Sequence, residues 1–195
     1  MNIGIDIDNT LTEIQEELNK AAYDYAIKLG KNINNAENQL EDIKNNGDAY
    51  KKKFEFTYDE LKYFLKDIQE EITNKAEPRP DVVEVIKKLK KNGHKIFIVT
   101  ARDSEFHDDP YLLSKDWLDK NNIEYDRLIV NAREKAIVCK QENIELFIDD
   151  QLNNCLEISR AGIKVIRITD DENSNDQITN LSNWQEIYEF IGNNK

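Results

Sequence analysis

The sequence predicts an α/β fold, in which a parallel sheet has helices on both faces and a small helical segment is inserted after the first strand. From about residue 78 onward, short apolar runs alternate regularly with segments of helical periodicity, which is typical of a parallel sheet. Between residues 13 and 77, apolar residues recur only at helical spacing. We therefore expect a core made of residues 1–12 and 78–195, and a helical cap at residues 13–77.

The first elements follow from local signals. A buried strand is expected at 2–7, because this apolar run ends in acidic residues. The helix after it should end at Gly30, since glycine readily adopts the left-handed conformation of a helix end. A second strong helix should follow Thr57, which has capping-box spacing with Glu60. The Asn-rich stretch between these two helices, up to about Asp48, is either a loop or a marginal helix.

The rest of the chain alternates helix and strand, and its last helix should begin at a capping box formed by Ser182 and Gln185. The acidic segment 170–176 before that helix is interpreted as solvated loop. Strands are expected at 95–100, 127–130, 145–148 and 164–168, and helices at 80–93, 112–121, 134–142 and 153–161.

Bulk properties exclude several classes of protein. A chain of 195 residues has room for one core and an inserted subdomain. Its net charge of -12 argues against binding polymeric nucleic acid, which requires many Lys and Arg side chains. The first residues lack the pattern of a signal peptide and no segment is apolar enough to span a membrane, so we expect a cytoplasmic protein without a membrane partner. Cys139 and Cys155 are interpreted as reduced structural residues.

Chemically useful side chains lie where the predicted strands end. Asp6 and Asp8 follow the first strand, Thr100 ends the second, and Asp149-Asp150 ends the fourth, while Lys135 begins the helix after the third. Ligands of open parallel sheets bind at these carboxyl ends. Two carboxylates 4 Å apart repel by about 4 kcal/mol at an effective dielectric constant of 20, so a cation is needed. Oxygen ligands without a His or Cys cluster favour Mg²⁺.

Taken together, these residues resemble a known family. Asp6-Ile7-Asp8-Asn9-Thr10, Thr100, Lys135 and Asp149-Asp150 match, in order, the four motifs of the haloacid dehalogenase superfamily. The helical block resembles the cap that this superfamily carries between its first and second motifs. Among its branches, the chain is most similar to the 5'(3')-deoxyribonucleotidases and related bacterial nucleotidases. The resemblance covers the whole chain and implies a Rossmann-like core with this cap.

The resemblance implies a phosphomonoester hydrolase that works through an aspartyl-phosphate. Asp6 would be the nucleophile, and Asp8 would protonate the leaving oxygen and then activate water. Mg²⁺ would be held by Asp6, the Asp8 carbonyl and an acid of the fourth motif. Either Asp149 or Asp150 supplies this last ligand, and Asp150 is favoured because superfamily members with Gly-Asp there use the second position.

The phosphoryl oxygens would be bound by Thr100, by the backbone amides of Ala101 and Arg102, and by Lys135. Arg102 has two interpretations, a phosphate contact and a surface salt bridge. Lys140 is an alternative to Lys135, which is favoured because it lies at the helix start.

The substrate expected from the resemblance is a small phosphorylated metabolite, with a nucleoside monophosphate as the best single choice. Sugar phosphates are the alternative, because the cap sets specificity. A phospho-accepting regulatory module and a catalytically silent binding module are less favoured. Oligomeric state is not predicted. Cap residues are more often packing or solvated surface than substrate contacts, and neither His94 nor His107 receives a role. The cap candidates for substrate contact are Lys51, Lys52, Lys53, Phe54, Phe56, Tyr58, Tyr63 and Phe64.

Overall fold

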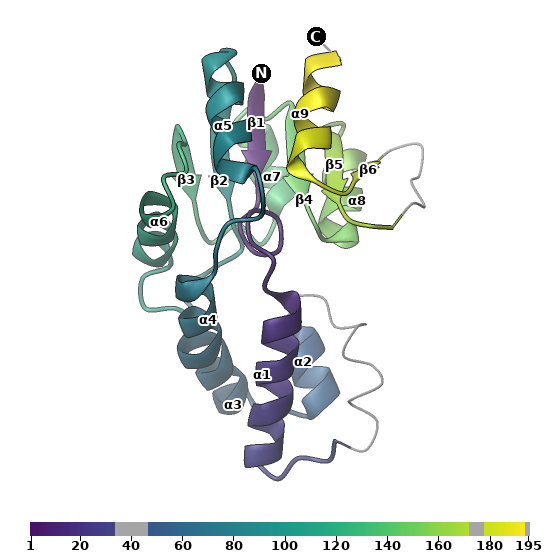
Figure 1. The fold of residues 1–195 in the computed structure, drawn as a ribbon. Helices are drawn as coiled ribbons and strands as arrows, with labels where there is room; N and C mark the ends of the chain where they lie inside the picture. The colour runs from purple at the N-terminus through teal and green to yellow at the C-terminus, as the bar shows by residue number, and fades with distance from the viewer. Residues whose placement is uncertain (34–46, 172–177, 194–195) are drawn as a thin grey trace.

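A six-stranded parallel sheet forms the centre of the larger part of the molecule. The computed structural model describes residues 1–33, 47–171 and 178–193 (Figure 1). The strand order is β3-β2-β1-β4-β5-β6, so the chain first builds outward from β1 in one direction and then in the other. The order therefore reverses at β1, and the sheet's ligand site is expected there. The strands are β1 (Asn2–Ile5), β2 (Lys95–Val99), β3 (Arg127–Ile129), β4 (Leu146–Asp149), β5 (Lys164–Ile168) and β6 (Thr179–Leu181).

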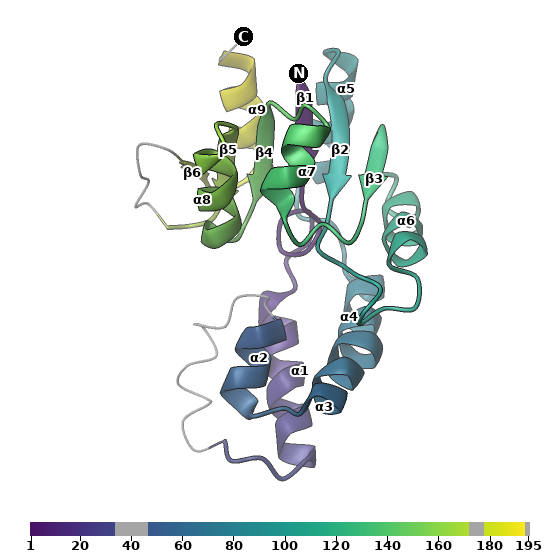
Figure 2. The same ribbon diagram turned by 180° about the vertical axis from the view of Figure 1, so that it is seen from behind.

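Helices cover both faces of this sheet. α5 (Val82–Lys91) and α9 (Trp184–Asn193) lie on one face, and α7 (Lys135–Gln141) and α8 (Leu152–Arg160) lie on the other (Figures 1 and 2). α6 (Pro110–Lys120) lies beside the edge strand β3. The parallel sheet with helices on both faces confirms the predicted fold class.

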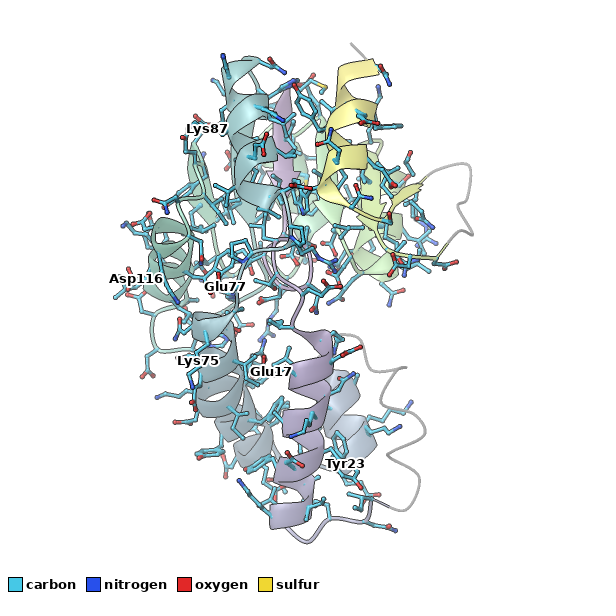
Figure 3. All side chains as sticks on the ribbon, in the orientation of Figure 1. Glu17, Tyr23, Lys75, Glu77, Lys87 and Asp116 are labelled. Atoms are coloured by element: carbon cyan, nitrogen blue, oxygen red, sulfur yellow. The ribbon has the colours of Figure 1, made fainter. Side chains whose placement is uncertain are left out.

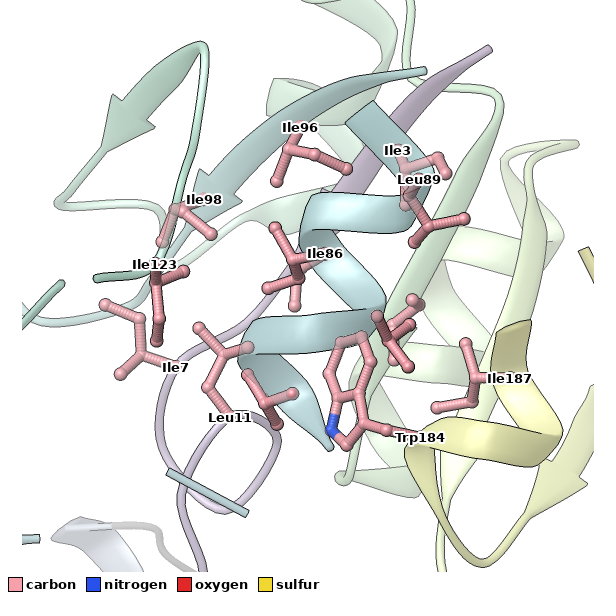
Figure 4. Packing of buried hydrophobic residues seen from close by; sticks show 14 of the residues in the cluster. Ile3, Ile7, Leu11, Ile86, Leu89, Ile96, Ile98, Ile123, Trp184 and Ile187 are labelled. Carbon is pink, nitrogen blue, oxygen red and sulfur yellow. The ribbon is translucent and has the colours of Figure 1, made fainter. Parts of the chain in front are cut away.

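Apolar side chains hold these layers together. Figure 4 shows Ile86 and Leu89 of α5 packed with Ile3 of β1 and with Trp184 of α9. Trp184 is 1 % exposed and its indole N–H donates to the carbonyl of Thr10, 3.2 Å away. The last helix thereby anchors the loop that follows β1, which carries the acids of the first motif.

β1 lies inside the sheet, between β2 and β4, and the side chains around it are closely packed. Gly4 lies opposite Phe97 of β2 and Phe147 of β4. A Cβ atom at Gly4 would lie 2.4 Å from the Phe147 ring, so the close packing of this strand requires glycine.

The chain between β1 and β2 forms a helical insertion, defined here as α1 to α4. The carboxyl ends of β1 and β2 face it (Figures 1 and 2). Its apolar core is separate from that of the sheet, while charged side chains such as Glu17 and Lys75 lie on its outside (Figure 3). The insertion comprises α1 (Gln15–Lys28), α2 (Gly47–Phe54), α3 (Tyr58–Tyr63), the π-helical turn η2 (Phe64–Gln69) and α4 (Glu70–Lys75).

Several local predictions are confirmed. Thr57 and Glu60 form the expected capping box, with the Thr57 N–H donating to the Glu60 carboxylate at 2.7 Å. Gly30 follows α1 with φ 68°. Cys139 and Cys155 are buried free thiols. Apart from these predictions, no helix of the described residues is both long and apolar enough to cross a membrane.

Other details differ from the sequence prediction. The final helix is capped one residue later than expected, because the Asn183 side chain accepts from the N–H of Glu186 at 2.9 Å. Strand β6 was not predicted, and neither was η2, which interrupts the helix expected after Thr57. Most of the Asn-rich stretch (34–46) and of the acidic loop (172–177) lies outside the described residues.

Candidate active site

Three carboxylates meet at the carboxyl ends of β1 and β4. These strands are parallel neighbours, and the N–H of Asp6 donates to the carbonyl of Ile148 at 3.1 Å. One carboxylate oxygen from each of Asp6, Asp149 and Asp150 lies within 4.8 Å of the others. The strand pairing thus brings together acids that are more than 140 residues apart in the sequence.

Lys135 lies between two of these acids. Its Nζ is 3.0 Å from Asp6 Oδ1 and 2.6 Å from Asp149 Oδ2, and the residue is 4 % exposed. Burial acts to lower the pKa of Lys135, but the neighbouring carboxylates outweigh it and raise the pKa, so the ammonium group stays charged. Lys140, the alternative, is exposed.

Asp149 and Asp150 differ in how their carboxylates are bound. Asp149 is fully buried and accepts hydrogen bonds from Lys135, from the N–H of Gln151 (2.8 Å) and from the side-chain amide of Asn154 (3.1 Å). The half-buried Asp150 carboxylate accepts from the hydroxyl of Thr10 at 3.3 Å. Asp149 is therefore fixed by protein donors, while Asp150 keeps more capacity for another ligand.

The acid cluster fits a hard divalent cation. Burial raises the pKa of Asp6 to about 7, and nearby Asp149 and Asp8 add to this, although Lys135 opposes it. Burial, with Asp149 and Asp6, also raises the pKa of Asp150 well above its usual value. Both carboxylates thus resist ionisation without more positive charge nearby. Closely spaced oxygen ligands that need such charge are suited to Mg²⁺.

Asp8 is held by a buried arginine. Arg102 Nε and Nη2 donate to the two Asp8 oxygens at 3.0 and 2.8 Å, and Nη1 donates to Ser114 at 3.3 Å. The Arg102 side chain is 3 % exposed, so this pair is not the surface salt bridge considered from the sequence. Burial acts to raise the pKa of Asp8, but the Arg102 guanidinium outweighs it and lowers the pKa.

The loop after β2 forms part of the cleft wall. Thr100 is fully buried and its hydroxyl accepts from the N–H of Arg102 at 3.3 Å. Ala101 is exposed at the cleft. The structure therefore gathers every residue predicted for the site at one edge of the sheet. The cleft has a volume of about 510 Å³ and includes Asp6, Asp8, Thr100, Ala101, Arg102 and Lys135 among its lining residues.

The helical insertion supplies the opposite wall of the cleft. Of the cap candidates, Tyr58 and Lys51 line it, whereas Phe54, Phe56 and Phe64 are buried in the insertion's own core.

Several wall residues received no role from the sequence. His107 Nδ1 lies 2.6 Å from Glu70 Oε1 and thereby joins the loop after β2 to α4. Leu65 and Gln69 lie on η2, and Arg133 precedes α7. No local pattern marks these residues, because their position depends on how the insertion packs over the sheet.

Comparison with known proteins agrees with this geometry. The family model described as haloacid dehalogenase-like hydrolase matches residues 2–162. A nucleotidase from Clostridium acetobutylicum is 34% identical over 137 residues, which cover 68% of this chain and 69% of the relative. A predicted phosphoglycolate phosphatase from Haemophilus somnus has a TM-score of 0.69 at 19% identity, with 97% of both chains covered. A predicted phosphatase from C. acetobutylicum has a TM-score of 0.70 at 14% identity, with 98% of both covered. These two structural likenesses concern the fold.

Proposed function

Because the chain belongs to the haloacid dehalogenase-like hydrolases, we propose that it is a Mg²⁺-dependent phosphomonoester hydrolase that acts on nucleoside monophosphates through an aspartyl-phosphate. One observation carries the proposal. Asp6, which follows the central strand, shares a buried cluster with Lys135, Asp149 and Asp150, and lines the same cleft as Asp8. The residues proposed as nucleophile, as separate acid and as cation ligands therefore lie together at the switch point of the sheet.

The proposed chemistry has two steps. An Asp6 oxygen attacks phosphorus, the bond from phosphorus to the leaving oxygen breaks, and Asp8 gives that oxygen a proton. Because Arg102 lowers the pKa of Asp8, this step requires Asp8 to take up a proton when the anionic substrate binds. Water then attacks the phosphorus of the aspartyl-phosphate, Asp8 takes a proton from the water, and the bond to Asp6 breaks. Phosphate is released and both carboxyl groups return to their first state. Splitting one difficult displacement into two is the usual benefit of a covalent intermediate.

The residues around phosphorus would bind the charge that develops on its oxygens. We assign this role to Thr100, to the backbone amide of Ala101 and to the ammonium group of Lys135. Lys135 would also favour the ionised form of Asp6, and bound Mg²⁺ would add to this effect. Arg102 already binds Asp8, so we propose that it holds Asp8 in place. A phosphate contact by Arg102 stays a prediction.

Asp6, the carbonyl of Asp8 and Asp150 would hold Mg²⁺. Asp150 is preferred to Asp149 because protein donors already occupy the Asp149 carboxylate. When bound, Mg²⁺ would screen the anionic nucleophile from the anionic phosphate.

Residues 13–77 would act as the cap over a core of residues 1–12 and 78–195. An isolated bridge between Thr12 and Pro78, where the chain leaves and re-enters the core, supports this division. The nucleotide substrate is supported by the printed name of the C. acetobutylicum relative. Sugar phosphates remain the alternative class for the cleft.

Hydrolysis of a panel of phosphorylated compounds tests this function. Nucleoside monophosphates, sugar phosphates and an aryl phosphate are assayed with Mg²⁺ and with EDTA. We expect the nucleotides to have the highest kcat/KM, and EDTA to abolish turnover of every substrate. If every sugar phosphate had a higher kcat/KM than the nucleotides, the nucleotide assignment would be wrong, whereas the proposed type of reaction would still hold.

A further inference from the structure

The turn η2 changes which residues of the insertion are buried. A π-helical turn closes its hydrogen bonds one residue later than an α-helix does, and such turns are frequent at functional sites. Residues beyond it are therefore rotated about the helix axis. Ile68, expected on the buried face of a continuous α-helix, is only half-buried, whereas the polar Gln69 is 8 % exposed. The turn thus buries an amide at a position where apolar periodicity predicts none.

Among the described residues, none donates a hydrogen bond to the amide oxygen of Gln69. Within the ranges 1–33, 47–171 and 178–193, its Oε1 is shielded from solvent and accepts no hydrogen bond. A buried polar atom in this state is unfavourable, and such atoms usually have partners in folded proteins. A ligand that donates a hydrogen bond to this atom would therefore gain binding free energy, because the atom has no hydrogen bond to water that must first be broken.

Gln69 also borders the substrate space. Gln69 lines the cleft together with Leu61 and Leu65 of the same helical run, and Asp6 and Asp8 line the same cleft. The two leucines offer no hydrogen-bonding side chain. The next residue, Glu70, is already paired with His107 at 2.6 Å. Gln69 thus carries an unsatisfied acceptor on the wall of the cleft that the helical insertion supplies, and because Oε1 is shielded from solvent, the amide must turn toward the cleft before a ligand can reach it.

We propose that Gln69 determines specificity by accepting a hydrogen bond from a donor on the leaving group. The inference rests on the proposed function, because a phosphoryl group at Asp6 would place the remainder of the substrate in this cleft. The donor is an N–H of a nucleobase or a hydroxyl of a sugar. Gln69 would act in recognition and would take no part in proton transfer.

The test compares Gln69→Met with the wild-type protein on three substrates. Met has a similar length and helix propensity but lacks the amide. The substrates are a nucleoside monophosphate, ribose 5-phosphate and an aryl phosphate without an N–H or O–H on its ring. We expect kcat/KM for the nucleotide to fall about tenfold relative to that for the aryl phosphate, which corresponds to about 1.4 kcal/mol. The control is Gln185→Met, on the exposed surface of α9, which should change no ratio.

Each outcome bears on the proposal. An equal fall for ribose 5-phosphate identifies a sugar hydroxyl as the donor, and a fall for the nucleotide alone identifies the base. Equal effects on all three substrates would overturn the role of Gln69. If the wild type hydrolyses no nucleotide, the proposed substrate is wrong, yet the ratio for ribose 5-phosphate still decides the role of Gln69. If Gln69→Met does not fold, Gln69→Asn replaces it, since it withdraws the amide by one methylene and should lower the same ratio.

Discussion

Replacing Arg102 by Met should destabilise the fold in a pH-dependent manner. The substitution leaves the Asp8 carboxylate without its bidentate partner at a position where the two side chains are 3% and 11% exposed. Removing one member of a buried ion pair costs about 3–5 kcal/mol, and we expect about 3 kcal/mol here because Asp8 borders the cleft. Urea unfolding at pH 7.5 measures this difference, provided that the transition is two-state.

The sign of the pH dependence follows from Asp8. In the wild type its pKa is lowered, so its charge stabilises the fold above the unfolded pKa, and this contribution is lost as pH falls through the folded pKa. In the variant, burial remains and acts to raise the pKa of Asp8, opposed only by the weaker effects of His107 and Lys135, so the charged form destabilises the fold until acid neutralises it. The decrease in the free energy of unfolding caused by Arg102→Met should therefore be largest at pH 7.5 and smaller at pH 5.

Arg133→Met is the matched control. Arg133 also binds two carboxylates, Asp103 at 2.6 Å and Glu105 at 2.5 Å, but its side chain is 54% exposed. Solvent screening should limit its loss to about 1 kcal/mol or less. Equal decreases in the free energy of unfolding for the two variants would refute the reasoning. A decrease for Arg102→Met that does not change with pH would also refute it.

Two further predictions concern stability. Gly4→Ala should lower the free energy of unfolding in urea by about 1–3 kcal/mol, because its Cβ would overlap the Phe147 ring. The control Gly192→Ala, whose Cβ has open space, should cost nothing. Equal effects of the two substitutions would contradict the packing of β1. Asp126→Asn should cost about 0.5–1 kcal/mol at pH 7, and this cost should disappear as the pH falls through the lowered pKa of Asp126, since burial is outweighed by Lys90 and the N–H of Ile96, which together lower the pKa of Asp126. Its charge therefore stabilises the fold fully above the unfolded pKa, and this contribution is lost as the pH falls through the folded pKa; a cost that persists below both pKa values would contradict this assignment.

The positions of the site residues at the carboxyl ends of the strands were predictable, because each position depends on a local sequence pattern. An apolar run followed by acids marks the ends of β1 and β4, and the parallel pairing of these strands then places Asp6 beside Asp149. Lys135 was predictable for a similar reason, as the first residue of α7.

Features that depend on pairing across the fold were not predictable. The partner of Asp8 is Arg102, 94 residues away, and no spacing rule links them. The His107–Glu70 contact requires the insertion to be packed against the loop after β2. Strand β6 has three residues without apolar alternation, and it forms because it pairs with β5 at the sheet edge. The turn η2 overrides the helical periodicity that its residues display.

Trapping the covalent intermediate tests the nucleophilic role of Asp6 most directly. The protein is mixed with substrate and Mg²⁺, quenched in acid within one turnover, and digested for mass spectrometry. We expect a hydroxylamine-sensitive phosphoryl group on the peptide that contains Asp6, absent from Asp6→Asn and present in the control Asp126→Asn. Full turnover by Asp6→Asn, or a phosphoryl group on another residue, would contradict the mechanism.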